Sequence, residues 1–380
     1  MRRRCAKWTS SAAVIILCGF VSGGAVRAAP VDSLGMTNDE DGVKVVLGPT
    51  KGLVFQSESS RLAFHGYAWL RAKADTVVGD ETDLEGSVPV ARLFLDGDFL
   101  DSKLDLFAQT EFAGSSPELL DLFVQWNFEK PFVLRVGQFR TPYSRAYITP
   151  LTNLELPTRG LVIDHFGLGR DTGAMVSGLV LSNRFHYDLA VVNGATINNQ
   201  SGNRDAPSVI GRGEIRFGGG LPYDQAPSLR QTDVSGLVIG FGAAYSRRKV
   251  EDTSGSSSEG RTNTSVDVAA SRGPLSFRAE GFWRAAHGSP RVANAFGAYG
   301  QFGIFVIPKT LELGGRVGWV SDGPDTQSYE AFLAGYLRSG PLVLGHHLKL
   351  ILAFRYDTAD PGGPSRRDRF SEILQAQIFF

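Results

Sequence analysis

The chain has 380 residues, and its 39 basic residues balance its 39 acidic residues, so the formal net charge is zero. A protein that binds nucleic acid through a basic surface carries an excess of lysine and arginine, so this composition argues against a nucleic-acid partner. Glycine (45 residues) and phenylalanine (25 residues) are abundant, and no linker or composition shift divides the chain. These features favour one large all-β unit.

Residues 1–28 have the layout of a secretory signal peptide. Four basic side chains between residues 2 and 7 precede an apolar stretch over residues 11–21, and residues 26–28 suit a cleavage site. The alternative is a membrane anchor, but the apolar stretch is too short to span a bilayer as a helix. Cleavage would remove both cysteines and five basic residues but no acidic one, leaving an exported, slightly acidic chain without disulfides.

Residues 29–60 form an N-terminal segment that precedes the long strand patterns. Two short apolar runs, Val43 to Leu47 and Leu53 to Phe55, flank a Gly-Pro-Thr-Lys-Gly sequence at 48–52, and together they predict a small hairpin. The segment could lie in the periplasm or tuck into the mouth of a pore, and the sequence leaves both placements open.

Apolar and polar residues alternate with a period of two through most of residues 61–380, which is the pattern of strands with one apolar face. From 104 to 112 the even positions are Leu, Leu, Ala, Thr and Phe, whereas the odd positions from 103 to 111 are Lys, Asp, Phe, Gln and Glu. Most such runs are about ten residues long, enough to cross a bilayer at a tilt. The pattern predicts strands at 62–73, 88–100, 102–113, 118–129, 131–140, 171–182, 184–193, 207–218, 235–249, 262–271, 274–285, 293–307, 310–321, 328–339, 346–357 and 370–380.

The connections between these strands alternate between short and long. Tight turns are predicted near 101–102, 129–130, 182–183, 272–273 and 308–309, and longer loops at 74–87, 141–170, 194–206, 250–261 and 358–369. Short turns on one rim and long loops on the other are typical of outer-membrane barrels. Two connections depart from this rule, because 219–234 is long for a short turn and 113–117 is short for a long loop.

The alternation predicts a transmembrane antiparallel β-barrel of about 16 strands over residues 61–380, in the outer membrane of a Gram-negative bacterium. After residue 29 no run of 18 apolar residues could form a helical span. The polar faces carry ions of both signs, which the core of a soluble sandwich could not hold unpaired. A barrel of this size leaves a water-filled lumen that can hold them.

Catalytic and cofactor motifs are missing from the sequence. We find no Gly-x-Ser-x-Gly, His-Glu-x-x-His or Walker-type sequence, so we expect neither an enzyme nor a cofactor or metal. An outer-membrane barrel hydrolase that uses a Ser–His pair remains the less favoured alternative.

Loop 141–170 is the longest connection and contains more apolar residues than a fully exposed loop would. A loop of this length in a compact fold is usually functional. If it folds back into the lumen it narrows the pore and brings its arginines to the solute. The alternative is that these arginines pair with loop carboxylates or with lipopolysaccharide phosphates, and the sequence leaves both open.

At this point the chain resembles the phosphate-selective porin O and P family. The resemblance is carried by Val133-Leu-Arg-Val-Gly-Gln-Phe-Arg-Thr-Pro-Tyr-Ser144, by Phe166-Gly-Leu-Gly-Arg-Asp-Thr-Gly-Ala174, by Val90-Ala-Arg-Leu-Phe-Leu-Asp-Gly97 and by the terminal Phe380. It implies a sixteen-stranded trimeric porin with a constricting third loop. Family members known for phosphate uptake carry a ladder of arginines and a lysine cluster, whereas this chain has only nine lysines, one of them at position 7.

We therefore expect a porin for the passive diffusion of small solutes, with anions such as phosphate preferred. A general or weakly cation-preferring porin is the alternative, because carboxylates share the polar faces and could pair with the arginines. The expected surroundings are outer-membrane lipid, lipopolysaccharide and two further copies of the chain. Solute-binding residues are predicted on the strands at Arg92, Arg135, Arg212, Arg216, Arg278 and Arg316, and in or beside the loop at Arg140, Arg145, Arg159 and Arg170.

Overall fold

The computed structural model describes residues 34–37, 43–48, 52–194, 196–198, 204–218, 220–229, 235–252, 255–287, 294–323, 325–339, 342–343, 348–359 and 367–380. The predicted signal peptide, residues 1–28, lies outside them. Among the described residues, no helix combines the length and the apolar character needed to cross a membrane.

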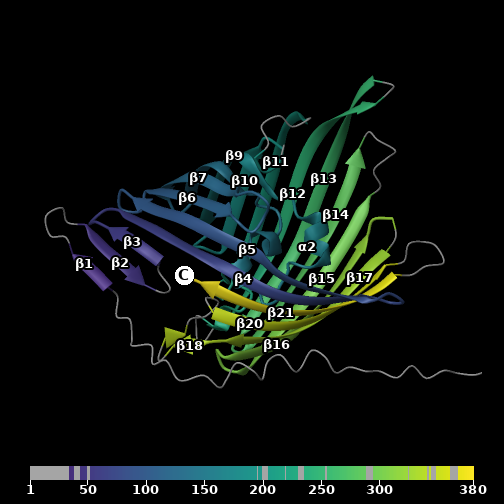
Figure 1. Cartoon of the computed structure of the whole chain (residues 1–380). Coiled ribbons are helices and arrows are strands. Elements are labelled where there is room, and N and C mark those ends of the chain that lie inside the picture. The colour runs from purple at the N-terminus through teal and green to yellow at the C-terminus, as the bar shows by residue number, and fades with distance from the viewer. Residues whose placement is uncertain are drawn as a thin grey trace, which may run out of the picture.

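Sixteen antiparallel strands of the described chain form a closed barrel (Figure 1). Each pairs with the next barrel strand, and the last strand pairs with the first. Closure gives every strand two neighbours, so no backbone edge is left unpaired in lipid. The prediction of a sixteen-stranded barrel is confirmed. The strands are β4 (Arg61–Val77), β5 (Thr82–Phe99), β6 (Leu104–Glu111), β7 (Glu118–Glu129), β8 (Phe132–Arg140), β9 (Arg170–Val180), β10 (Phe185–Val192), β11 (Arg204–Phe217), β12 (Ser235–Asp252), β13 (Gly255–Arg272), β14 (Leu275–His287), β15 (Ala295–Ile307), β16 (Leu311–Ser321), β17 (Asp325–Tyr336), β20 (Leu348–Ala359) and β21 (Arg367–Phe379).

The two faces of the barrel wall differ in chemistry. On β14 the outward Leu275 and Phe277 are 53% and 47% exposed, whereas the inward Ser276, Arg278 and Glu280 are buried. An exposed apolar outer face suits contact with lipid tails. The inner face holds the charged groups, and buried charges require partners close by. The polar chemistry of the protein is therefore concentrated inside the barrel.

Tight turns join the strands at one rim, which we call the short-turn rim. Residues Leu100–Ser102, Leu181–Asn183 and Lys309 have positive φ angles in these turns. Backbone hydrogen bonds close the turns, for example from Lys103 N to Leu100 O at 3.3 Å. These turns lie where the sequence predicted them. The opposite rim carries loop 141–169 and is called the long-loop rim.

Two connections predicted as long loops are mostly strand. The expected loop 74–87 contains the ends of β4 and β5, and the expected loop 250–261 contains the ends of β12 and β13. Their residues are polar on both faces, which removes the alternation that marks a membrane-crossing strand. The backbones still pair, as Lys73 opposite Glu85 shows. Beyond the lipid, strand pairing needs no apolar face, so these hairpins extend past the predicted ends.

The N-terminal segment contributes three short strands beside the short-turn rim: β1 (Leu34–Thr37), β2 (Lys44–Gly48) and β3 (Gly52–Gln56). β2 and β3 form the predicted hairpin, with Val45 opposite Phe55. β3 then pairs with the first residues of β4, beside the point where Phe380 N donates to Gly66 O at 2.8 Å. Figure 1 shows this hairpin at the end of the barrel where the C-terminus lies.

Candidate functional site

Loop 141–169 joins β8 to β9 and folds against the inner wall of the barrel. Buried side chains of its second helix, Val162, Ile163 and Phe166, form one cluster with Phe282 and Tyr299 of the wall. Figure 1 shows this helix within the ring of strands. Loop residues with this much apolar surface are stabilised by burial, which explains the unusual composition of the loop. Its elements are α1 (Arg145–Ile148), a 3₁₀ turn at Leu151–Asn153 and α2 (Leu161–Phe166).

The start of α1 is held by a carboxylate from the wall. Glu280 on β14 accepts hydrogen bonds from Ser144 Oγ at 3.0 Å, Arg145 N at 3.2 Å and Ala146 N at 3.3 Å. Ser144 in turn accepts from Tyr147 N at 3.2 Å, as an N-cap residue does. Acceptor oxygens at the first N–H groups of a helix satisfy donors that have no partner within the helix. Glu280 therefore fixes the path of the loop across the lumen.

Arg145, a predicted solute-binding residue, is buried and fully engaged. Its Nη1 lies 2.9 Å from Glu214 Oε1 on β11, and its Nη2 donates to Leu221 O and Pro222 O. The guanidinium carbon also lies 4.8 Å from the centroid of the Tyr223 ring. With these contacts, and an exposed fraction of 7%, Arg145 joins the loop to β11 and to the residues that follow it.

Glu155 anchors the middle of the loop. Its carboxylate is completely buried and accepts hydrogen bonds from Ser276 Oγ at 2.8 Å and Gln301 Nε2 at 2.6 Å. It also lies 3.4 Å from Arg278 Nη1. The neighbouring Leu154 carbonyl accepts from Lys349 on β20. A buried carboxylate needs such partners, so these contacts hold the middle of the loop in one position against the wall.

Residues 220–229, at the short-turn rim between β11 and β12, meet the loop inside the barrel. We call them the rim segment. Gln225 N donates to Asn153 O at 2.9 Å, and Gln225 Oε1 accepts from Glu155 N at 3.0 Å. Asn153 Nδ2 also donates to Tyr223 O at 3.1 Å. This contact explains the length of the connection 219–234, which a simple short turn would not need.

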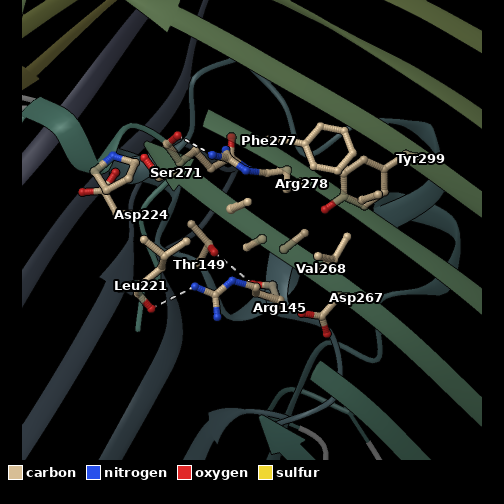
Figure 2. A pocket seen from close by; sticks show the side chains of 16 residues that line it. Arg145, Thr149, Leu221, Asp224, Asp267, Val268, Ser271, Phe277, Arg278 and Tyr299 are labelled. Carbon is tan, nitrogen blue, oxygen red and sulfur yellow. Dashed lines mark hydrogen bonds between the residues drawn. The ribbon is translucent and has the colours of Figure 1, made fainter. Parts of the chain in front are cut away.

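Figure 2 shows the small cavity between the loop, the rim segment and the wall. Arg145, Thr149, Leu221 and Arg278 are among the residues that surround it, and its volume is about 20 Å³. A water molecule needs a cavity of roughly that size. The cavity is therefore a packing feature of the junction and is too small for a solute.

Arg140 and Arg159 have no carboxylate within ion-pair distance among the described residues, and their hydrogen-bond partners are backbone carbonyls of the loop. Arg140 Nη1 donates to Ile148 O at 3.0 Å and to Thr149 O at 3.2 Å. Arg159 Nη2 donates to the same Thr149 O at 2.7 Å, and its Nη1 donates to Ala146 O. Burial and the nearby charge of Arg140 lower the pKa of Arg159 to about 9, which leaves it positively charged at neutral pH. Two guanidinium groups thus converge on one carbonyl.

Arg92 and Arg170 are further positive charges that act on Arg159. Arg92 Nε lies 2.7 Å from Glu111 on the neighbouring strand, and Arg170 Nε lies 3.0 Å from Asp121. We call Arg92, Arg140, Arg159 and Arg170 the arginine cluster. Its four positive charges face two carboxylates, so the cluster keeps a positive excess.

The remaining predicted arginines are occupied by other partners in the structure. Arg212 lies 2.7 Å from Asp267 and 2.9 Å from Glu214, and Arg216 lies 3.2 Å from Glu214. Arg316 lies 2.8 Å from Glu330 and donates to Arg159 O, which holds the loop. Arg278 pairs with Glu155 as described above. Arg135 is different, because it donates to Gln125 Oε1 at 2.6 Å and forms no ion pair within the described chain.

The sequence did not identify the rim segment or the inward aromatic side chains of β4 to β7 as parts of the site. The unusual length of 219–234 was the available signal for the rim segment. Phe107 and Phe123 stand among polar residues on their strand faces, which was the signal for the aromatic group. The part of the chain that the structure describes contains no group of three or more His, Cys, Asp or Glu side chains placed to hold a metal ion.

Comparisons with known proteins agree with this architecture. The family model for phosphate-selective porin O and P matches residues 66–335. The outer membrane channel DcaP of Acinetobacter baumannii is 12% identical with a TM-score of 0.58, over 86% of this chain and 99% of that one. OprB of Pseudomonas putida is 10% identical with a TM-score of 0.59, over 84% and 94%. The trimer form of OmpT, an outer membrane protein of Vibrio cholerae, is 12% identical with a TM-score of 0.55, over 85% and 100%. A comparison with curated protein sequences gave no significant match.

Proposed function

Since the chain belongs to the phosphate-selective porin O and P family, and is therefore an outer-membrane porin for passive diffusion, we propose that it prefers small anions. Phosphate or an anionic metabolite is the proposed cargo. Loop 141–169 is the proposed constriction, and the arginine cluster is the proposed point of selection. The channel acts by diffusion and not by hydrolysis.

The observation that carries this proposal is the pair Arg140 and Arg159. Both guanidinium groups are held by backbone carbonyls, which orient them without cancelling their charge. A guanidinium can replace part of the hydration shell of an oxyanion through charge-assisted hydrogen bonds. The site must also release the ion, and a few weakly binding hydrogen-bond donors allow faster release than a site that surrounds the ion completely. The loop therefore supplies the proposed narrowing and Arg159, and Arg140 adds its charge from the end of β8.

The alternative of a general or weakly cation-preferring porin is favoured by one observation. Asp105, nearer the short-turn rim, accepts hydrogen bonds from Gln125 and Asn127 at 2.9 Å and forms no ion pair among the described residues. A negative zone below the arginine cluster would reduce anion selectivity. We place the preference at the cluster because it lies beside the proposed constriction, where a solute has the least water around it.

We also propose a homotrimer surrounded by outer-membrane lipid and lipopolysaccharide. The OmpT neighbour was solved in a trimer form. On the outer face, Gly281 of β14 lies opposite Ala298 of β15, and Ala279 lies opposite Gly300. A Cβ atom added to either glycine would meet open space. Four small residues on adjacent strands make a shallow surface on which a second barrel could pack closely.

Solute flux into proteoliposomes tests the proposed preference. Liposomes containing the purified protein are expected to swell several-fold faster in a monovalent organic anion than in an organic cation of the same size, because the positive cluster raises the local anion concentration. A neutral solute of that size gives the reference rate. Faster entry of the cation, or equal rates for all three solutes, would favour the general porin.

A further inference from the structure

Aromatic side chains line part of the inner wall of β4 to β7. His65 lies opposite Phe94 in the strand register, and Phe107 lies opposite Phe123. The ring centroids are 4.6 Å apart for His65 and Phe94, 6.3 Å for Phe94 and Phe107, and 5.3 Å for Phe107 and Phe123. We call these four residues the aromatic band. They form a continuous row across four adjacent strands.

Arg135 continues this row on β8. Its guanidinium carbon lies 4.2 Å from the centroid of the Phe123 ring, and Gln125 Oε1 accepts two of its hydrogen bonds. The cation therefore lies over an aromatic face and, within the described chain, forms no ion pair with a carboxylate. A cation over the face of a ring is attracted by the negative face of the ring, so this contact helps to hold Arg135 in place.

The strand register places the aromatic band directly beside the arginine cluster. Arg92 precedes Phe94 by two residues on β5, and Asp121, the partner of Arg170, precedes Phe123 by two on β7. Two residues along a strand span about 7 Å. The band lies on the short-turn side of the cluster. A solute that passes the cluster toward that rim meets the aromatic rings next.

Packing within the protein accounts for only part of this row. Phe94 is 9% exposed and packs with Tyr67 and Trp69, whereas Phe107 and Phe123 are partly buried and keep part of each ring exposed. The exposed part of a phenylalanine ring in a polar channel lumen does not gain the free energy that burial would give it. A flat apolar surface next to a positive cluster complements a molecule that carries an acidic group on an aromatic ring.

We propose that the preferred cargo within the anionic class is an aromatic monocarboxylate. Its carboxylate is drawn to the arginine cluster, and its ring passes along the band at Phe107, beside the guanidinium of Arg135 that lies over Phe123. Phosphate and aliphatic acids use the cluster but gain nothing from the rings. This inference rests on the proposed anion preference, and the test below separates the failure of one from the failure of the other.

The test compares the permeabilities of benzoate, cyclohexanecarboxylate and acetate from bi-ionic reversal potentials across planar bilayers. Benzoate is larger than acetate, so free diffusion alone gives it the lower permeability. The wild-type channel is expected to favour benzoate over both other acids. The double variant Phe107→Leu/Phe123→Leu is expected to lower the benzoate-to-acetate ratio about three- to tenfold, which corresponds to the loss of aromatic stacking. Its chloride-to-potassium selectivity should stay as in the wild type.

The matched control is Phe277→Leu/Phe302→Leu, because these two phenylalanines face outward on β14 and β15. This control variant should leave the permeability ratios of the three acids and the chloride-to-potassium selectivity unchanged. Should the double variant fail to insert, the single Phe123→Leu variant is measured in its place. Two results would overturn the aromatic proposal while leaving the anion preference intact. One is a benzoate-to-acetate permeability ratio that is the same in Phe107→Leu/Phe123→Leu as in the wild type. The other is a wild-type ratio equal to the value for free diffusion. Potassium selectivity in the wild type overturns the anion preference itself.

Discussion

Replacing Arg140 and Arg159 together by glutamine is expected to lower the single-channel conductance about two- to threefold at about 0.1 M KCl, and to leave it nearly unchanged at about 1 M. At low salt the positive cluster raises the chloride concentration at the constriction, and the current depends on that excess. At high salt the charges are screened within about 3 Å, so the bulk concentration decides the current. Glutamine keeps hydrogen-bond donors for Thr149 O, so the loop should keep its path.

The control for this variant is Arg184→Gln, which removes a positive charge at an exposed turn of the short-turn rim. That change should alter the conductance little at either salt concentration. An Arg140→Gln/Arg159→Gln channel with the wild-type salt dependence would show that the two arginines do not control the ions in the lumen. Conductance that falls equally at both concentrations would indicate a displaced loop.

Replacing Glu155 by alanine is expected to release the middle of loop 141–169 and to raise the single-channel conductance at high salt. The change leaves Arg278 buried without its carboxylate and removes the acceptor for Ser276 and Gln301. Removing one partner of a buried ion pair costs about 3–5 kcal/mol. The barrel itself should stay closed, because its strands are joined by backbone hydrogen bonds that the substitution does not touch.

The Glu155→Gln variant is the matched comparison. Glutamine is nearly the same size but has one acceptor oxygen, which can serve Ser276 or Gln301 but not both, and it also leaves Arg278 without a carboxylate. Its conductance should therefore lie between those of the wild type and Glu155→Ala. Current steps that become larger and noisier in that order would support a constriction held by this contact. Equal conductance in all three proteins would show that the loop does not narrow the channel.

Most of the barrel could be predicted from the sequence because its signals are local. The two-residue alternation depends only on neighbouring positions, and it locates strands such as β7 at 118–129, as predicted. The ends of β4 and β12 were missed for the same reason, since polar paired strands carry no alternation. Tight turns such as that at Leu100–Ser102 were found because the alternating patterns stop there.

Which arginines form ion pairs could not be predicted, because the pairing depends on residues that are far apart in the sequence. Arg145 pairs with Glu214, which is 69 residues away in the sequence, and Arg278 pairs with Glu155, which is 123 residues away. Such pairs follow from the strand register and from the path of the loop, neither of which a single sequence reports. Arg159 lies in the same loop as Arg145, and Arg140 lies immediately before it, yet of these three only Arg145 forms an ion pair with a carboxylate among the described residues.

The zero-current potential of the wild-type protein in a KCl gradient is the most direct test of the anion preference. Purified protein is inserted into a planar bilayer, and the potential is measured with the more concentrated salt on one side. The arginine cluster predicts a potential displaced toward the chloride equilibrium value, and more strongly so when both solutions are dilute. A potential displaced toward the potassium value would contradict the account and would identify the carboxylates of the lumen as the selecting groups.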